Sequence, residues 1–165
     1  MKNLKSILLA GFLTVGTFAT SVFTSCNPDA CKDVVCNNGG TCTDGTCSCV
    51  AGFEGTNCDT ESRTKIFGSF LLSGTDSDGD TYTNINTTVS TSSSSATKFI
   101  FSVPLAALSL TCTMTGANTF TIDQTTVSGV TTTGSGTYNG TTLTISINQN
   151  DAGGTLITNL SGNKQ

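Results

Sequence analysis

The 165-residue sequence predicts an all-β protein in two parts: a small disulfide-rich module, then an antiparallel β domain of seven or eight strands. The first part is indicated by the cysteines, because six of the eight lie between residues 31 and 58. The second is indicated by short runs after residue 64 in which apolar residues alternate with threonine and serine, separated by turn residues. Strands linked as neighbours in this way close as an up-and-down barrel or pack as a sandwich.

Composition excludes several classes of function. The sequence contains no histidine, which removes Ser-His-Asp and Cys-His catalysis and histidine-ligated zinc. It shows neither a pair of acids on neighbouring predicted strands nor a phosphate-binding loop, so we expect that the protein is not an enzyme. From residue 26 onward, eleven acidic residues face five basic ones, and this balance predicts no nucleic-acid partner.

Residues 1–25 have the features of a secretory signal peptide. Two lysines precede an uncharged apolar run over residues 7–23, and small polar residues follow. A membrane-spanning anchor is the alternative, but threonines and glycines interrupt the run. The segment "VFTSC" resembles a bacterial lipobox, with Ser25 before Cys26. This resemblance implies that Cys26 is acylated and anchors the protein to a membrane, with residues 26–30 as a short tether. The competing interpretation is a secreted protein with Cys26 as a thiol.

The six clustered cysteines have the spacing C-x4-C-x5-C-x4-C-x-C-x8-C. Six cysteines allow fifteen pairings, so spacing alone does not fix the connectivity. A zinc site is not favoured, because structural zinc sites use two separated C-x2-4-C pairs. So short a segment cannot bury enough apolar surface to fold alone, and cross-links in an oxidising compartment compensate for this. Asp44-Gly45 and Gly39-Gly40 provide tight turns.

The cysteine spacing and the tail "CSCVAGFEGTNC" closely resemble an EGF-like domain over residues 27–59, with its cysteines at 31–58. This resemblance implies three disulfides, Cys31–Cys42, Cys36–Cys47 and Cys49–Cys58. Some EGF-like domains bind calcium through residues before the first cysteine. Here Asn27 and Asp29 could provide oxygen ligands, but Ala30 stands in place of a carboxylate or amide.

Residues 59–63 form a polar junction, and residues 64–165 are predicted to form the β domain. Three segments, "KFIFSV", "LSLTCTMT" and "LTISIN", alternate strictly, as expected of half-buried strands. Their predicted inward residues are Phe99, Phe101, Val103, Leu108, Leu110, Cys112, Met114, Leu143, Ile145 and Ile147. Asn139-Gly140 predicts a hairpin with a type I′ turn. The order of segments and the stretch "GSGTYNGTTLTI" resemble lipocalin-like modules that follow a single EGF module in surface lipoproteins of the Bacteroidota. This resemblance implies a meandering barrel, with or without a cavity.

Two further features of the β domain are candidate sites. Asp76, Asp78 and Asp80 in "DSDGD" alternate like the first half of a calcium loop, but Thr87 occupies the position of the final bidentate glutamate, and a solvated hairpin loop is the favoured interpretation. Cys112 lies on the apolar face of its predicted strand, so we expect a buried and unreactive thiol. No cofactor other than calcium is indicated.

These features predict an extracytoplasmic lipoprotein anchored to the outer membrane or the cell surface. We expect it to act as a binding or adhesion module, with the EGF-like module as a pedestal and the β domain contacting a protein or glycan partner. The alternative is a carrier or sensor that holds a small apolar ligand inside the barrel. Whether the inward side chains fill the barrel or leave a void distinguishes the two.

Overall fold

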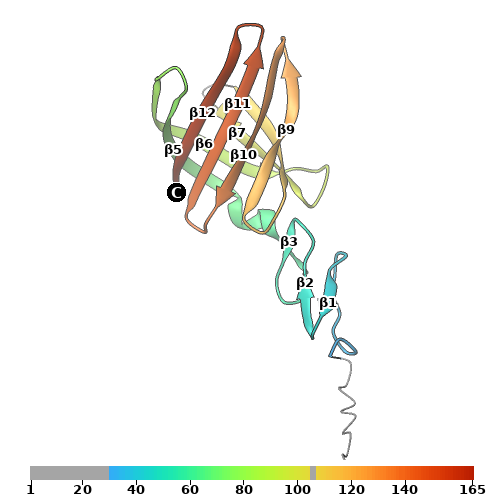
Figure 1. Cartoon of the computed structure of the whole chain (residues 1–165). Helices are drawn as coiled ribbons and strands as arrows, with labels where there is room; N and C mark the ends of the chain where they lie inside the picture. The colour runs from blue at the N-terminus through green and yellow to red at the C-terminus, as the bar shows by residue number, and fades with distance from the viewer. Residues whose placement is uncertain (1–29, 105–106) are drawn as a thin grey trace, which may run out of the picture.

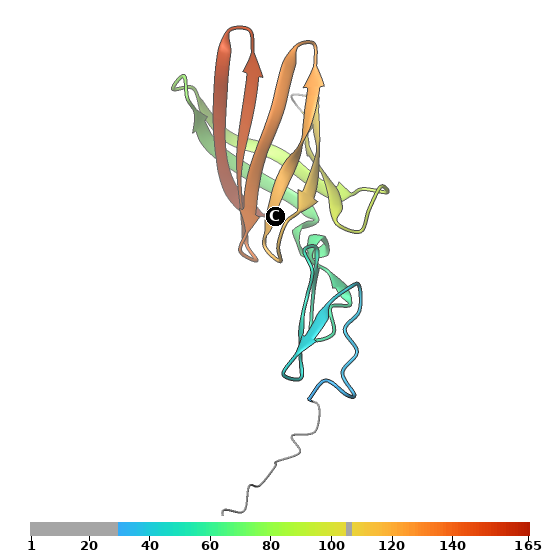
Figure 2. The ribbon, with the colours of Figure 1, turned by 45° about the vertical axis from the view of Figure 1, so that its right-hand side comes forward.

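The computed structural model describes residues 30–104 and 107–165, and it places a small disulfide-rich module at one end of a β-barrel (Figures 1 and 2). The module contains two short hairpins, β1 (Thr41–Thr43) with β2 (Thr46–Ser48) and β3 (Phe53–Glu54) with β4 (Thr60–Glu61). A 3-10 helix, η1 (Ser62–Ile66), leads into the barrel. The predicted division into a disulfide-rich region and an all-β domain is therefore confirmed.

The barrel is closed and consists of eight strands in the described residues. These are β5 (Gly68–Asp76), β6 (Thr81–Thr91), β7 (Lys98–Val103), β8 (Leu108–Met114), β9 (Thr119–Val127), β10 (Val130–Tyr138), β11 (Thr142–Asp151) and β12 (Gly154–Lys164). Each strand pairs antiparallel with the next along the chain, and β12 pairs with β5 to complete the ring. Of the two predicted architectures, the up-and-down barrel is the one observed.

The cysteines of the module are paired as the EGF resemblance implies, in the disulfides Cys31–Cys42, Cys36–Cys47 and Cys49–Cys58. Among the described residues before Ser62, Cys58 is the one apolar side chain that is fully buried. A module with so little apolar burial depends on its cross-links, because each closes a short loop and restricts the unfolded chain.

Two tight turns have the positive φ angles of type I′. Asp44 (φ 49°) with Gly45 (φ 79°) joins β1 to β2, and Ser128 (φ 51°) with Gly129 (φ 81°) joins β9 to β10. The predicted hairpin at Asn139-Gly140 is present, but its turn type is not the predicted one. Gly140 has a positive φ of 100° and Asn139 does not. The Asn139 side chain instead accepts hydrogen bonds from backbone N–H groups of the wider loop.

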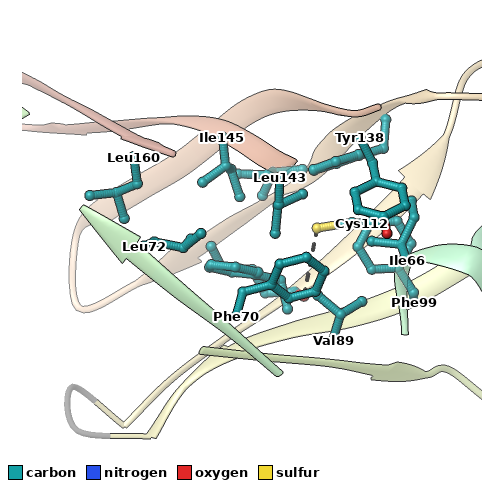
Figure 3. Close-up of a cluster of buried hydrophobic side chains, with 14 of the residues drawn as sticks. Ile66, Phe70, Leu72, Val89, Phe99, Cys112, Tyr138, Leu143, Ile145 and Leu160 are labelled. Carbon is teal, nitrogen blue, oxygen red and sulfur yellow. Dashed lines mark hydrogen bonds between the residues drawn. The ribbon is translucent and has the colours of Figure 1, made fainter. Parts of the chain in front are cut away.

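Buried apolar side chains pack inside the barrel (Figure 3), and the phenylalanines among them lie toward the end nearest the module, which we call the closed end. Phe70, Phe99, Phe101 and Phe120 are fully buried there, and the Phe99 and Phe120 rings meet edge to face with centroids 5.0 Å apart. The predicted inward residues of the three alternating segments are buried, except Leu108, which is partly buried. Strand alternation therefore predicted the facing of these side chains correctly.

Glycines allow the sheet to bend where β5 and β12 meet. A Cβ atom on Gly74 would lie 1.8 Å from the backbone oxygen of Asn159, and one on Gly162 would lie 1.8 Å from that of Leu71. Neither contact is possible for a larger residue without moving backbone. These two positions therefore let adjacent strands approach closely enough to close the ring.

Helix η1 closes the barrel and joins it to the module. Ile66 is 0% exposed and belongs to the core cluster. Arg63, 8% exposed, donates hydrogen bonds from Nη1 to the carbonyl oxygens of Ser92, Ser95 and Lys98 in and around the β6–β7 loop. One end of the barrel is thus sealed by the segment that leaves the module, and the opposite end, the open end, carries the β5–β6, β9–β10 and β11–β12 connections.

Candidate ligand-binding site

The open end of the barrel contains a cavity of about 400 Å³. Its lining comes from inward positions of five strands: Tyr82 and Ile85 on β6, Val103 on β7, Leu108 on β8, Ile147 and Gln149 on β11, and Thr158 and Leu160 on β12. Most of these side chains are apolar. The volume lies within the range of pockets that hold small molecules, roughly 300–1,000 Å³.

The cavity exists because the inward side chains become smaller toward the open end. At the closed end, four phenylalanines fill the space between the strands. Toward the open end, β12 presents Thr158, and no phenylalanine is among the residues that line the cavity. A barrel of eight strands is just wide enough for side chains to fill it, so small inward residues leave space for a ligand.

The rim of the cavity holds a fixed polar pair. Tyr82 Oη donates a 2.8 Å hydrogen bond to Asp76 Oδ2, while Asp76 Oδ1 accepts from the backbone N–H groups of Asp78 and Asp80. The hydrogen bond from Tyr82 is the largest cause that lowers the pKa of Asp76, and burial opposes it. The same hydrogen bond, together with burial, raises the pKa of Tyr82. Asp76 is therefore ionised and Tyr82 neutral at neutral pH.

Two polar side chains of the wall are available to a ligand. Within the described part of the chain, the side chains of Gln149 and Thr158 form no hydrogen bond. A few convergent polar groups in an apolar pocket orient a bound molecule. The structure therefore offers a mainly apolar site with an amide and a hydroxyl for a polar group of the ligand.

Gln149 also lines a second hollow of about 410 Å³ at the open end, which we call the polar pocket. Its other lining residues are Asp78, Val130, Asp151, Gly153, Gly154, Thr155 and Leu156. Asp151 Oδ1 accepts a hydrogen bond from the backbone N–H of Gly153. The polar pocket adjoins the apolar cavity through the side chain that they share.

The structure does not bring Asp76, Asp78 and Asp80 together as calcium ligands. Asp76 faces inward and its oxygens accept hydrogen bonds from the turn and from Tyr82, whereas Asp78 and Asp80 are exposed. Over residues 30–104 and 107–165, no three His, Cys, Asp or Glu side chains converge as a metal site. The other proposed calcium ligands, Asn27 and Asp29, lie outside the described residues, as does Cys26.

Cys112 is buried in the core and forms no disulfide. Burial is the main cause that raises the pKa of its thiol to about 12, and the charge of Asp123 adds to this. A thiol in this state is a poor nucleophile. The placement agrees with the expected unreactive side chain.

Sequence reasoning did not find the residues of the cavity wall apart from Val103, Leu108 and Ile147, which it placed facing inward. The available signal was alternation that continues through "ISINQ" and "LITNL", which puts Gln149 on the face of Ile147 and Thr158 on the face of Leu160. What the sequence does not show is whether neighbouring strands fill the space in front of these residues.

No protein-family model matches the sequence, and no curated protein matches it. None of the described residues forms a helix with the length and apolar character needed to span a bilayer.

Proposed function

We propose that the protein is an extracytoplasmic carrier or sensor that binds a small apolar ligand at the open end of its barrel. The apolar cavity of about 400 Å³ is the observation that carries this proposal. Inward side chains leave a void at that end, which is the feature that favours a carrier over a module that binds partners through its outer surface alone. Contact with a protein or glycan partner, and the absence of an enzymatic role, remain predictions.

The location of the protein is part of the same proposal. The lipobox resemblance supports acylation of Cys26, and the three disulfides suit an oxidising, extracytoplasmic compartment. The module would then act as a pedestal at the outer membrane or the cell surface. Intact-mass measurement of the membrane-extracted protein tests this, because acylation adds a definite mass. Replacement of Cys26 by serine should release the protein from membranes, and an unmodified wild-type mass would contradict the anchor.

The cavity is tested with Nile red, a neutral apolar dye, and a series of n-alkanols from hexanol to tetradecanol. The dye should gain fluorescence on binding, and the alkanols should displace it. Each added methylene that enters an apolar pocket contributes about 0.8 kcal/mol, which is close to a fourfold change in Kd. Affinity should therefore rise along the series and level off when the cavity is full. If the affinity does not change with the length of the alkanol, binding in the cavity is contradicted.

Two variants of β12 localise the binding. Thr158 faces the cavity, so Thr158→Phe should fill part of it and weaken dye binding at least tenfold. Asn159 is the outward-facing neighbour on the same strand, and Asn159→Phe should leave binding unchanged. Equal affinity of both variants for the dye would mean that it binds elsewhere.

A further inference from the structure

Charge is distributed unevenly along the barrel. Asp76 at the end of β5, Asp78 and Asp80 in the β5–β6 connection, and Asp151 at the end of β11 all lie at the open end. The described basic residues are elsewhere: Lys32 is in the module, Arg63 and Lys65 are in η1, and Lys98 and Lys164 are at the closed-end termini of β7 and β12. The open end is therefore negative, and none of the described cations compensates it.

The polar pocket places part of this charge directly beside the apolar cavity. Asp78 and Asp151 line the polar pocket, and Gln149 lines both spaces. In the described structure, the Asp78 side chain accepts no hydrogen bond and forms no ion pair, and the Asp151 side chain accepts one hydrogen bond, from the Gly153 backbone. Both carboxylates thus keep oxygen lone pairs available for a ligand.

A molecule that occupies both spaces has two chemically different ends. The apolar cavity accepts an aliphatic group, and the polar pocket accepts a group that donates hydrogen bonds to carboxylates. An anionic head group would meet two like charges with no cation to offset them, which is unfavourable. A protonated amine donates hydrogen bonds and carries the complementary charge.

We infer that the ligand is an amphiphilic amine, with its aliphatic part in the apolar cavity and its ammonium group in the polar pocket lined by Asp78 and Asp151. This inference rests on the proposed function, since it assigns a ligand class to the same site. It distinguishes the site from one for fatty acids, whose carboxylates require a cation. The lowered pKa of Asp76 agrees with it, because that carboxylate keeps its negative charge at the rim at neutral pH.

The test compares three probes with the same tail, dodecylamine, dodecanol and dodecanoate, each as a competitor of Nile red on the purified full-length protein at low salt. Dodecylamine should bind about tenfold more tightly than dodecanol, and dodecanoate should bind more weakly than dodecanol, because the head groups differ in charge near two carboxylates. High salt should reduce the advantage of the amine and leave dodecanol unchanged, since salt screens exposed charges.

Charge-matched variants show where the selectivity resides. The double variant Asp78→Asn with Asp151→Asn should remove most of the advantage of the amine over the alcohol and should not change the affinity of the alcohol. As the control, Asp33→Asn with Asp44→Asn removes the same charge from the module and should keep the preference.

The possible results separate the two proposals. If dodecanol displaces the dye but dodecylamine binds no better than dodecanoate, the amine inference is wrong and the apolar cavity stands. The same conclusion follows if the preference survives in the Asp78/Asp151 variant. If none of the three probes displaces the dye, both proposals fail.

Discussion

Replacement of Arg63 by alanine should strongly destabilise the barrel, because this side chain fixes the joint between the module and the closed end. Its Nη1 donates to the carbonyl oxygens of Ser92, Ser95 and Lys98, and its Nε lies 2.8 Å from Glu61 Oε2. The side chain is about one tenth exposed, so water cannot easily replace these partners.

The expected cost follows from these contacts. A hydrogen bond to a charged group contributes about 1.5–3 kcal/mol, but contributions within one network do not add. Removing the guanidinium takes the charged donor from three carbonyl oxygens, of which Ser95 keeps a bond from the Lys98 backbone N–H and Ser92 keeps one from the Thr91 hydroxyl. An unsatisfied buried polar group costs about 1–3 kcal/mol, so we expect a loss of about 3 kcal/mol for the network as a whole. At roughly 3 °C per kcal/mol for a protein of this size, the melting temperature should fall by about 10 °C. Arg63→Lys should recover little, because an ammonium group does not reproduce the fork of donors.

Thermal unfolding followed by far-UV circular dichroism measures this loss. The matched control is Lys65→Ala in the same helix, where the ion pair with Glu54 is about 30% exposed on both sides and should contribute less than about 1 kcal/mol. Hydrogen exchange of residues 92–97 should accelerate in Arg63→Ala and not in the control. If the two alanine variants unfold at the same temperature, Arg63 does not fix the joint as we have argued.

Three other predictions concern the barrel itself. Gly74→Ala should lower the free energy of unfolding by at least about 2–3 kcal/mol, because its Cβ would overlap the Asn159 backbone oxygen. In the control Gly153→Ala the new Cβ meets a movable side-chain atom at 3.2 Å, and the free energy of unfolding should change by no more than about 0.5 kcal/mol. Thermal unfolding compares the two variants, and equal losses of stability would contradict the close approach of β5 and β12. Cys112 should resist alkylation at pH 8 until the protein is unfolded in urea, as peptide mapping would show, and rapid labelling of native protein would contradict its burial. Burial of Asp123 favours a higher pKa, but hydrogen bonds from Lys98 and Thr113 outweigh it and the pKa is lowered, so the ionised form stabilises the fold above its ordinary pKa of 3.8. Asp123→Asn should be less stable than wild type at pH 7, and melting curves should converge as the pH falls through the lowered pKa; a constant difference down to pH 2 would contradict this.

The features that follow local rules were predictable from sequence. Alternation placed Phe99, Phe101 and Leu110 inward, because successive side chains of a strand point to opposite faces. The disulfide pairing came from the EGF resemblance rather than from spacing. The Asn139-Gly140 hairpin was predicted correctly, but its turn type was not, because the loop is wider than two residues and the Asn139 side chain stabilises it.

Features that depend on the packing of distant segments were not predictable. The sequence indicates a polar junction at residues 59–63, but it does not show that Ser62 and Arg63 are buried there. A charged residue predicts exposure unless its partners are known, and three carbonyl groups from residues 92–98 satisfy Arg63. The cavity likewise depends on the sizes of side chains on five strands that come together only when the barrel closes. The proposed calcium ligands alternated in sequence, but the turn uses Asp76 for its own hydrogen bonds.

The chain enters and leaves the barrel at the same end. There β5 begins next to η1, and after the end of β12 the Gln165 backbone N–H donates a hydrogen bond to the Ser69 carbonyl oxygen. The described connections at the open end, β5–β6, β9–β10 and β11–β12, join neighbouring strands, so each can change in length or composition while the strands stay paired. Residues that would contact a ligand at the open end can therefore change without changing the residues that pair the strands. A fusion partner or surface linkage at the C-terminus would also leave the open end unobstructed, which suits this barrel to immobilised binding assays.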